Sequence, residues 1–194
     1  QFDCVINLAA QAGVRYSIDN PGAYIQSNIV GFFNLMECIR HTNKCHLIYA
    51  SSSSVYGNNK VPFSVNDKTD MPVSIYAATK KANEALANSY ASLFGIPCTG
   101  LRFFTVYGPW GRPDMAYFSF TNKILANEEI SIFNNGDLLR DFTYIDDIID
   151  GIVSILEKGQ LKKHDNYSHK IYNIGNNKPV KLLEFVTLLG NLLN

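Results

Sequence analysis

The sequence predicts an α/β protein in which helices cover a doubly wound parallel sheet, followed by a smaller mixed region. Three observations predict this fold class. Apolar runs of strand length alternate with longer segments whose apolar residues recur at helical spacing. Turn and capping residues separate these segments. The 194 residues are 46% hydrophobic and 18% charged, which is ordinary for a globular chain with a substantial core.

The first strand and helix are the clearest elements. Residues 2–9 are mostly apolar over the length of a buried strand. Asn20 is a good helix N-cap, Pro21 suits the first helical turn, and apolar residues continue after them at helical spacing. We therefore expect a strand over residues 2–9 and a helix over 20–40, with a short buried strand at 46–50.

A long loop and a long helix come next. Residues 57–74 are rich in Gly, Asn, Pro and Asp and predict a loop, of a length that usually has a function in compact domains. The pattern of residues 75–94 predicts a helix, which Gly95 and Pro97 end. A strand over residues 99–105 follows.

Beyond Pro109 the alternation is looser and predicts a smaller, mixed region. We expect a strand at residues 130–133 and helices at residues 116–125, 146–157 and 182–193. The chain therefore divides into residues 1–107, which carry the sheet, and residues 108–194.

Charge, cysteine and histidine content exclude several functions. Seventeen basic residues balance seventeen acidic ones, so no general positive field attracts nucleic acid or an anionic membrane. No segment is apolar over the ~18 residues that a membrane span needs, and the sequence does not open on a secretory signal pattern. The four cysteines lack CxxC spacing and predict reduced thiols in a cytoplasmic protein. The four histidines lack metal-ligand spacing, so we expect no metal site.

The strongest chemical signal is Tyr76 with Lys80, in the helix predicted at residues 75–94. Four residues turn a helix by about 400°, so the two side chains lie on one face, one turn apart. We expect the opposite face, with Ala78, Ala82, Ala85, Leu86 and Leu93, to pack on the sheet. A nearby ammonium favours the phenolate form of tyrosine, which is then able to act as a base. Spacing alone leaves a solvated helix face as the alternative, because Tyr56 and Lys60 share it in a loop.

Four consecutive serines, Ser51 to Ser54, follow the strand predicted at residues 46–50. The carboxyl ends of parallel strands line the ligand crevice of an open sheet. A hydroxyl there can bond a substrate oxygen and pass a proton to Tyr76. Serines are also ordinary turn residues, and the run alone leaves that alternative open. Having both features on successive units of one sheet favours a catalytic site.

Five ordered motifs resemble a known family. They are Asn7-Leu8-Ala9-Ala10, Ser51-Ser52-Ser53-Ser54-Val55-Tyr56-Gly57, Tyr76 with Lys80, Leu101-Arg102-Phe103-Phe104-Thr105-Val106-Tyr107-Gly108-Pro109 and Arg140-Asp141-Phe142-Thr143-Tyr144-Ile145-Asp146-Asp147. Together they resemble the extended short-chain dehydrogenase/reductase family, whose fold is Rossmann-like, in its nucleotide-sugar epimerase branch. The segment Trp110-Gly111-Arg112-Pro113-Asp114-Met115 is most similar to that of UDP-glucuronate 4-epimerases.

The resemblance implies an NAD-dependent enzyme. Tyr76 is then the general base, and Lys80 holds the nicotinamide ribose and the phenolate. Seven further positions match cofactor-binding residues: Leu8, Ala9, Ala10, Asn28, Ala50, Ser51 and Phe103. Of these, Asn28 matches a residue that steadies a neighbouring strand end.

The resemblance also implies a site for a UDP-sugar. Ser52 matches the residue that binds the sugar 4-hydroxyl and helps to deprotonate it, and Thr105 matches one that touches the sugar. Arg140 is expected to pair with the UDP phosphates, because its planar fork binds two oxygens at once. Arg112, and less strongly Arg15, is a candidate partner for a glucuronate carboxylate, and either is an alternative partner for the diphosphate.

Ser53 and Ser54, also expected at the substrate, bear on the reaction. Related 4,6-dehydratases carry an Asp-Glu pair just before Val-Tyr-Gly, and decarboxylating relatives carry a Glu there. Serines at these positions favour inversion at C4 through a transient 4-ketone, and so conversion of UDP-glucuronate to UDP-galacturonate. UDP-glucose or an N-acetylhexosamine remains an alternative substrate. A 4,6-dehydratase or reductase is the alternative enzyme, and a non-catalytic NAD(P) sensor or scaffold is the alternative of another class.

The sequence departs from the family in one respect. None of its thirteen glycines forms the Gly-rich turn that places the pyrophosphate at a helix N-terminus. The sequence also begins at Gln1, without Met and directly in a strand, so we expect a piece of a longer protein. In that protein the helices over residues 25–39 and 78–94 either form a homodimer interface or simply pack in the core. The chain alone is expected to bind NAD weakly or not at all, and a micromolar dissociation constant in a titration would contradict this.

Overall fold

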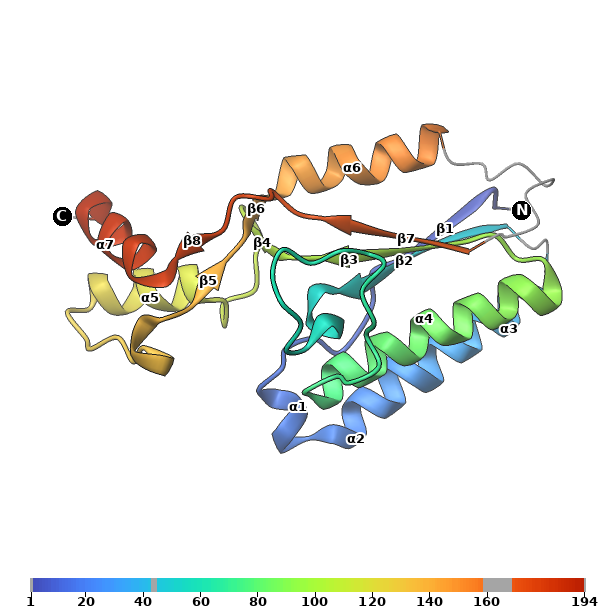
Figure 1. The fold of residues 1–194 in the computed structure, drawn as a ribbon, viewed down its shortest axis with the longest axis horizontal. Helices are drawn as coiled ribbons and strands as arrows, with labels where there is room; N and C mark the ends of the chain where they lie inside the picture. Colours follow the sequence, from blue (N-terminus) through green and yellow to red (C-terminus); the bar gives the residue numbers. More distant parts are fainter. Residues whose placement is uncertain (1, 43–44, 159–168, 194) are drawn as a thin grey trace. The chain divides into compact units, whose positions relative to one another are not determined.

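The computed structural model describes residues 2–42, 45–158 and 169–193 and separates the chain into two units (Figure 1). Unit 1 contains Gln1–Phe103 and Leu156–Ile174, and unit 2 contains Phe104–Ile155 and Gly175–Asn194. Unit 1 carries a four-stranded sheet, and unit 2 carries two sheets of two strands each. The predicted α/β class is confirmed.

The sheet of unit 1 is parallel throughout. Its strands lie in the order β1 (Cys4–Asn7), β2 (His46–Ser52), β3 (Cys98–Phe103) and β7 (His169–Ile174). The register pairs Ser52 with Phe103 and Phe103 with Ile174, so three strands end at one level. Strand β7 was not predicted, because half-buried and exposed residues alternate along its first four positions and polar residues interrupt any apolar run.

The helix expected over residues 20–40 is present but not uniform. After the short helix α1 (Tyr16–Asp19), the chain forms α2 (Pro21–Tyr24), a π-helical segment η1 (Ile25–Val30) and α3 (Gly31–His41) in direct succession. The Asn20 side chain accepts a hydrogen bond from the Ala23 amide, as an N-cap does. A π-turn inside a helix re-aims one residue and frequently marks a functional site.

Helix α4 (Ile75–Phe94) has the predicted bounds, but the opposite face packs on the sheet. Its buried residues include Ala77, Lys80, Glu84, Ala87 and Ala91. Leu93, expected in the packed face, is 72% exposed. The small alanines let the helix approach the strands, while the two charged side chains find polar partners at the strand ends.

The core of unit 1 lies between the sheet and the pair α3 and α4, which run side by side on one face of the sheet (Figure 1). Its buried side chains are Phe32, Met36, Ile39, Cys45, Leu47, Tyr49, Ala87, Tyr90, Ile96 and Cys98. This packing fixes α4 over β2 and β3, and therefore fixes where the first turn of α4 meets the strand ends.

Unit 2 is built from short strands and three helices. Strand β4 (Thr105–Tyr107) pairs in parallel with β6 (Phe142–Tyr144), and β5 (Leu139–Arg140) pairs antiparallel with β8 (Val180–Lys181). The helices are α5 (Ala116–Leu125), α6 (Ile145–Lys158) and α7 (Leu182–Leu193), all at or within one residue of their expected bounds. None of the helices in the described parts of the chain combines the length and apolar composition that spanning a membrane requires.

Two sequence-based strand predictions need correction. The strand expected at residues 130–133 is wrong: a 3-10 turn, η3 (Phe133–Gly136), occupies its end. Asn135 and Gly136 adopt left-handed backbone angles, which turn the chain before a ladder can form. The strand expected at residues 99–105 is broken at Phe104, where β3 ends and β4 begins.

Candidate active site

The first two turns of α4 bring Tyr76 and Lys80 together at the carboxyl end of β2. The Lys80 ammonium lies 5.8 Å from the centroid of the Tyr76 ring. Lys80 is buried, and its Nζ donates a hydrogen bond of 2.8 Å to the Ala50 carbonyl. Tyr76 is half-buried, and its ring packs edge-on against Tyr24. The bond to Ala50 places the tyrosine's helix beside the start of the serine run.

Lys80 is a buried cation of unusual acidity. Burial lowers its pKa from 10.5 to about 8. The side chain is therefore still mostly protonated at neutral pH. The positive charge of Lys80 lies beside the Tyr76 ring.

The serine run forms the end of β2 and the turn that follows. Ser52 is the last residue of β2 and caps the 3-10 turn η2 (Ser53–Tyr56), with its Oγ accepting from the Ser54 amide at 3.2 Å. Ser52 is buried, whereas Ser53 and Ser54 are half-buried. Helix α4 packs against both β2 and η2. The serines and Tyr76 therefore belong to one packed group of elements.

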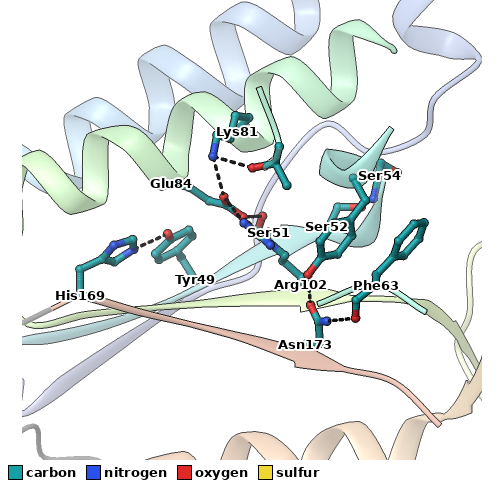
Figure 2. Close-up of polar contacts among 12 residues, drawn as sticks. Tyr49, Ser51, Ser52, Ser54, Phe63, Lys81, Glu84, Arg102, His169 and Asn173 are labelled. Carbon is teal, nitrogen blue, oxygen red and sulfur yellow. Dashed lines mark hydrogen bonds and ion pairs between the residues drawn. The ribbon is translucent and has the colours of Figure 1, made fainter. Parts of the chain in front are cut away.

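Sequence reasoning missed two charged residues of this group, Glu84 and Arg102. Figure 2 shows Glu84 from α4 and Arg102 from β3 pointing toward each other beside Ser51. Ser51 donates to Glu84 Oε1 at 2.6 Å, so its hydroxyl is held within the fold. Burial by itself raises the pKa of the Glu84 carboxyl, but the bonds from Arg102 and Ser51 bring it below its ordinary value. The sequence signal that could have identified them is a charged residue inside an otherwise packed element, notably an arginine in an apolar strand.

Asn28 fixes the backbone that follows β1. Its Oδ1 accepts from the Gln11 amide, and its Nδ2 donates to the Gln11 carbonyl and to Thr79 Oγ1. Asn28 is buried and lies in the π-helical segment, which aims it at both groups. It thus ties the segment after β1 to the first turn of α4. Gln11 lies four residues beyond the end of β1 at Asn7, and the expected role of Asn28 at the cofactor stays a prediction.

The carboxyl edge of the sheet fits the nicotinamide end of NAD. Leu8, Ala9 and Ala10 follow β1 as exposed residues, at the edge where ligands of open parallel sheets bind. Phe103 ends β3 opposite Ser52 and is half-buried. With the Lys80 cation and the Tyr76 phenol, these residues offer a ribose-binding donor and apolar contacts. The sequence supplies no Gly-rich turn for the pyrophosphate.

Unit 2 holds three of the expected substrate residues. Thr105 begins β4, and Arg112 lines a cavity of about 310 Å³ whose other walls include Phe104, Tyr107 and Tyr117. The Arg112 guanidinium is bound by both oxygens of Asp114, at 2.9 and 3.0 Å.

The other two candidate arginines, Arg140 and Arg15, are exposed, as Arg112 is. Arg140 lies in β5, and its Nη1 donates to the Leu139 carbonyl. The neighbouring Asp141 carboxylate accepts from the amides of Asn177 and Lys178. Arg15, in unit 1, immediately precedes α1. The structure therefore places Arg112, of the three arginines, at a cavity wall.

Comparison with known proteins identifies a family and several relatives of this chain. The model of the "NAD dependent epimerase/dehydratase family" matches residues 1–175. The chain is 55% identical over 205 residues to Protein CapI of Staphylococcus aureus, covering 100% of this chain and 61% of that protein. It is 52% identical over 203 residues to UDP-glucuronate 4-epimerase 2 of Arabidopsis thaliana, covering 99% of this chain and 47% of that protein.

A solved structure extends the comparison to the fold. The chain matches a UDP-glucuronic acid 4-epimerase from Bacillus cereus, in complex with UDP-glucuronic acid and NAD, with a TM-score of 0.89 and 36% identity. The match covers 98% of this chain and 59% of that one, so this chain spans less than two thirds of each relative named here. The resemblance expected from the five motifs is confirmed: the chain belongs to the NAD dependent epimerase/dehydratase family.

Proposed function

We propose that the protein carrying this chain is an NAD-dependent epimerase that inverts C4 of a UDP-sugar, and that it converts UDP-glucuronate to UDP-galacturonate. The observation that carries the proposal is the half-buried Tyr76 beside the buried Lys80 ammonium, at the carboxyl end of β2. The relatives named UDP-glucuronate 4-epimerase support the choice of sugar.

Unit 1 is the proposed NAD-binding part, and unit 2 is the proposed nucleotide-sugar-binding part. Leu8, Ala9 and Ala10 would lie along the cofactor, and Lys80 would bind the nicotinamide ribose. Bound NAD supplies a hydride acceptor for the hydrogen on C4 and a donor for its return.

Tyr76 moves the proton. A phenol has a pKa near 10, and lowering it by ~3 units takes about 4 kcal/mol, which a neighbouring ammonium in a partly desolvated site can supply. As phenolate, Tyr76 accepts the proton of the C4 hydroxyl while Ser52 Oγ bonds the same oxygen. Lys80 stabilises the phenolate. When the 4-ketone has turned and is reduced on its other face, Tyr76 returns the proton.

The environment of the turn argues against loss of water. Elimination needs a carboxyl group that can give up a proton, and positions 53 and 54 carry hydroxyls. The carboxylate that does reach this region, Glu84, is held ionised by Arg102 and Ser51. Inversion at C4 is therefore favoured over 4,6-dehydration.

Arg112 is the proposed partner of the glucuronate carboxylate. It stands at the wall of an aromatic-lined cavity, and its fork already binds one carboxylate, that of Asp114. Arg140, exposed in β5, is the proposed partner of the diphosphate. We further propose a cytoplasmic homodimer, because the four cysteines are free and because Ile25, Phe33 and Leu93 expose apolar surface on the helices of unit 1.

Product analysis with a Tyr76→Phe variant tests the proposal. In the natural polypeptide that contains this sequence, UDP-glucuronate and NAD should give UDP-galacturonate. Tyr76→Phe should lower kcat by about 10²–10⁴-fold with NAD still bound, since it removes the proton-transfer group. Tyr90→Phe, on the same helix but bonded to Glu37, is the control and should keep kcat. Undiminished turnover by Tyr76→Phe, or a 4-keto-6-deoxy sugar or pentose as product, would contradict the proposal.

A further inference from the structure

One buried ion pair lies behind the serine turn, which we define as residues 51–56. Arg102 Nε and Nη2 donate to the two oxygens of Glu84 at 2.8 and 2.9 Å. Only 4% of the arginine side chain and 5% of the glutamate side chain is exposed. Glu84 comes from α4 and Arg102 from β3, so the pair joins the helix of Tyr76 to the sheet.

The ion pair holds both ends of the serine turn. At the first end, Ser51 Oγ donates to Glu84 Oε1 at 2.6 Å. At the last end, the Arg102 guanidinium lies 4.8 Å from the centroid of the Tyr56 ring, in cation–π contact. The Tyr56 hydroxyl donates in turn to Asn173 Oδ1 at 2.6 Å. Ser52 lies between the two fixed ends.

Fold stability alone does not account for this arrangement. Removing two charges from water costs roughly what their attraction returns, and an apolar pair of equal volume is often as stable. Moreover, Arg102 Nη1 is buried without a hydrogen-bond acceptor among the residues that the structure describes. The ion pair makes directional contacts that an apolar pair cannot make. These contacts fix Ser51 and the Tyr56 ring at set positions.

We propose that Glu84 and Arg102 are positioning residues, which clamp the two ends of the serine turn and thereby hold the Ser52 hydroxyl at the reacting oxygen. The inference rests on the proposed function, in which Ser52 bonds the C4 hydroxyl. A misplacement of about 1 Å at such a site can cost on the order of 10²-fold in rate. The ion pair therefore acts on kcat through Ser52, without itself touching substrate.

A double-mutant cycle between Ser51 and Ser52 tests this. Ser51→Ala removes one hydroxyl and leaves Glu84 and Arg102 bonded to each other. It should lower kcat about tenfold, with KM for the UDP-sugar within about twofold and little change in unfolding midpoint. In a Ser52→Ala background, Ser51→Ala should cause no further loss, because the group it positions is gone.

The matched control is Tyr90→Phe. It also removes a hydroxyl that donates at 2.6 Å to a glutamate, Glu37, which is likewise paired with an arginine, Arg40. That cluster lies between α3 and the end of α4, so kcat should stay within about twofold. Should Ser51→Ala fail to fold, Tyr56→Phe tests the other end in the same cycle, since it keeps the ring over Arg102 and removes the hydroxyl, which interacts with Arg102 and donates to Asn173.

The outcomes separate the two proposals. Equal losses from Ser51→Ala with and without Ser52, or a change in KM alone, overturn the positioning role while the proposed function stands. Unchanged kcat in Ser52→Ala, or no turnover of any UDP-sugar by the wild type, overturns the proposed function and this inference with it.

Discussion

The described part of the chain contains two arginine–carboxylate forks, in which two guanidinium nitrogens donate to the two oxygens of one carboxylate, and they have nearly equal geometry and opposite surroundings. Arg102 and Glu84 meet at 2.8 and 2.9 Å with side chains 4% and 5% exposed. Arg112 and Asp114 meet at 2.9 and 3.0 Å with side chains 44% and 65% exposed. Distances alone would give the two forks the same role. Their burial gives them different ones.

The difference follows from what can replace each partner. A buried charge that loses its partner cannot be solvated by water instead. The Arg102–Glu84 fork therefore stays intact and is suited to holding neighbouring side chains in position. An exposed arginine exchanges one carboxylate for another at little cost, so the Arg112–Asp114 fork suits a ligand site.

The largest expected effect is loss of stability on breaking the buried fork. Arg102→Leu should lower the free energy of unfolding by about 3–5 kcal/mol, because it leaves the buried Glu84 carboxylate with only the partly exposed Lys81 ammonium, 3.7 Å away, as a counter-charge. Arg112→Leu, the matched change in the exposed fork, should cost about 0–1 kcal/mol. Urea unfolding of both variants measures the two values. Equal losses would show that burial does not separate the forks.

The next largest expected effect is a pH dependence of the free energy of unfolding that comes from Lys80, because Lys80 is a buried cation bonded to a carbonyl. Its pKa in the folded protein is about 8, below its ordinary 10.5. Below about pH 8 the lysine is protonated in both states, so its burial opposes folding. Above that, the folded state releases the proton first and stability rises, by at most about 1.4 kcal/mol per pH unit.

Comparison with Lys80→Met isolates the contribution that Lys80 titration makes to the free energy of unfolding. The free energy of unfolding of the wild type, minus that of the variant, should rise between about pH 8 and 10.5 and be flat below about pH 7. Urea unfolding at three pH values measures it. A difference that is constant, or that falls, over that range would mean that Lys80 is not a desolvated cation.

Breaking the exposed fork should change substrate binding more than it changes the free energy of unfolding. Arg112→Ala is expected to raise KM for UDP-glucuronate about 10–100-fold, the effect of losing a charge-assisted hydrogen bond worth roughly 1.5–3 kcal/mol. KM for UDP-glucose, which lacks the carboxylate, should change about twofold or less, and serves as the control. An equal rise for both sugars would assign Arg112 to the diphosphate instead.

The smallest expected effect is at Asp114. Asp114→Asn removes the carboxylate that competes for the Arg112 fork, so KM for UDP-glucuronate should fall about two- to fivefold. The gain should shrink in roughly 1 M salt, which screens exposed charges. A rise in KM would show that Asp114 holds Arg112 ready for substrate rather than competing with it.

Much of the fold was predictable because local signals mark it. Helix α4 begins after Ser74, which caps it, and ends at Gly95, which adopts a left-handed backbone angle. Strand β7 was not predictable in the same way, because its alternating polar residues find their place only by pairing with β3.

The site shows the same division. Tyr76 and Lys80 could be predicted, since helical spacing alone places them together. The packed face of their helix was predicted on the wrong side, because a buried lysine and glutamate resemble solvent-facing charges until their partners are known. Those partners, Ser51 and Arg102, lie 33 and 18 residues from Glu84 along the chain, beyond the reach of any local pattern.

The central claim is that the hydrogen on C4 leaves as hydride while Tyr76 takes the hydroxyl proton, and that the same hydrogen returns. UDP-glucuronate carrying deuterium at C4, turned over in ordinary water, measures this directly. The account predicts UDP-galacturonate that keeps its deuterium at C4. Deuterium lost to water in the epimer would contradict it.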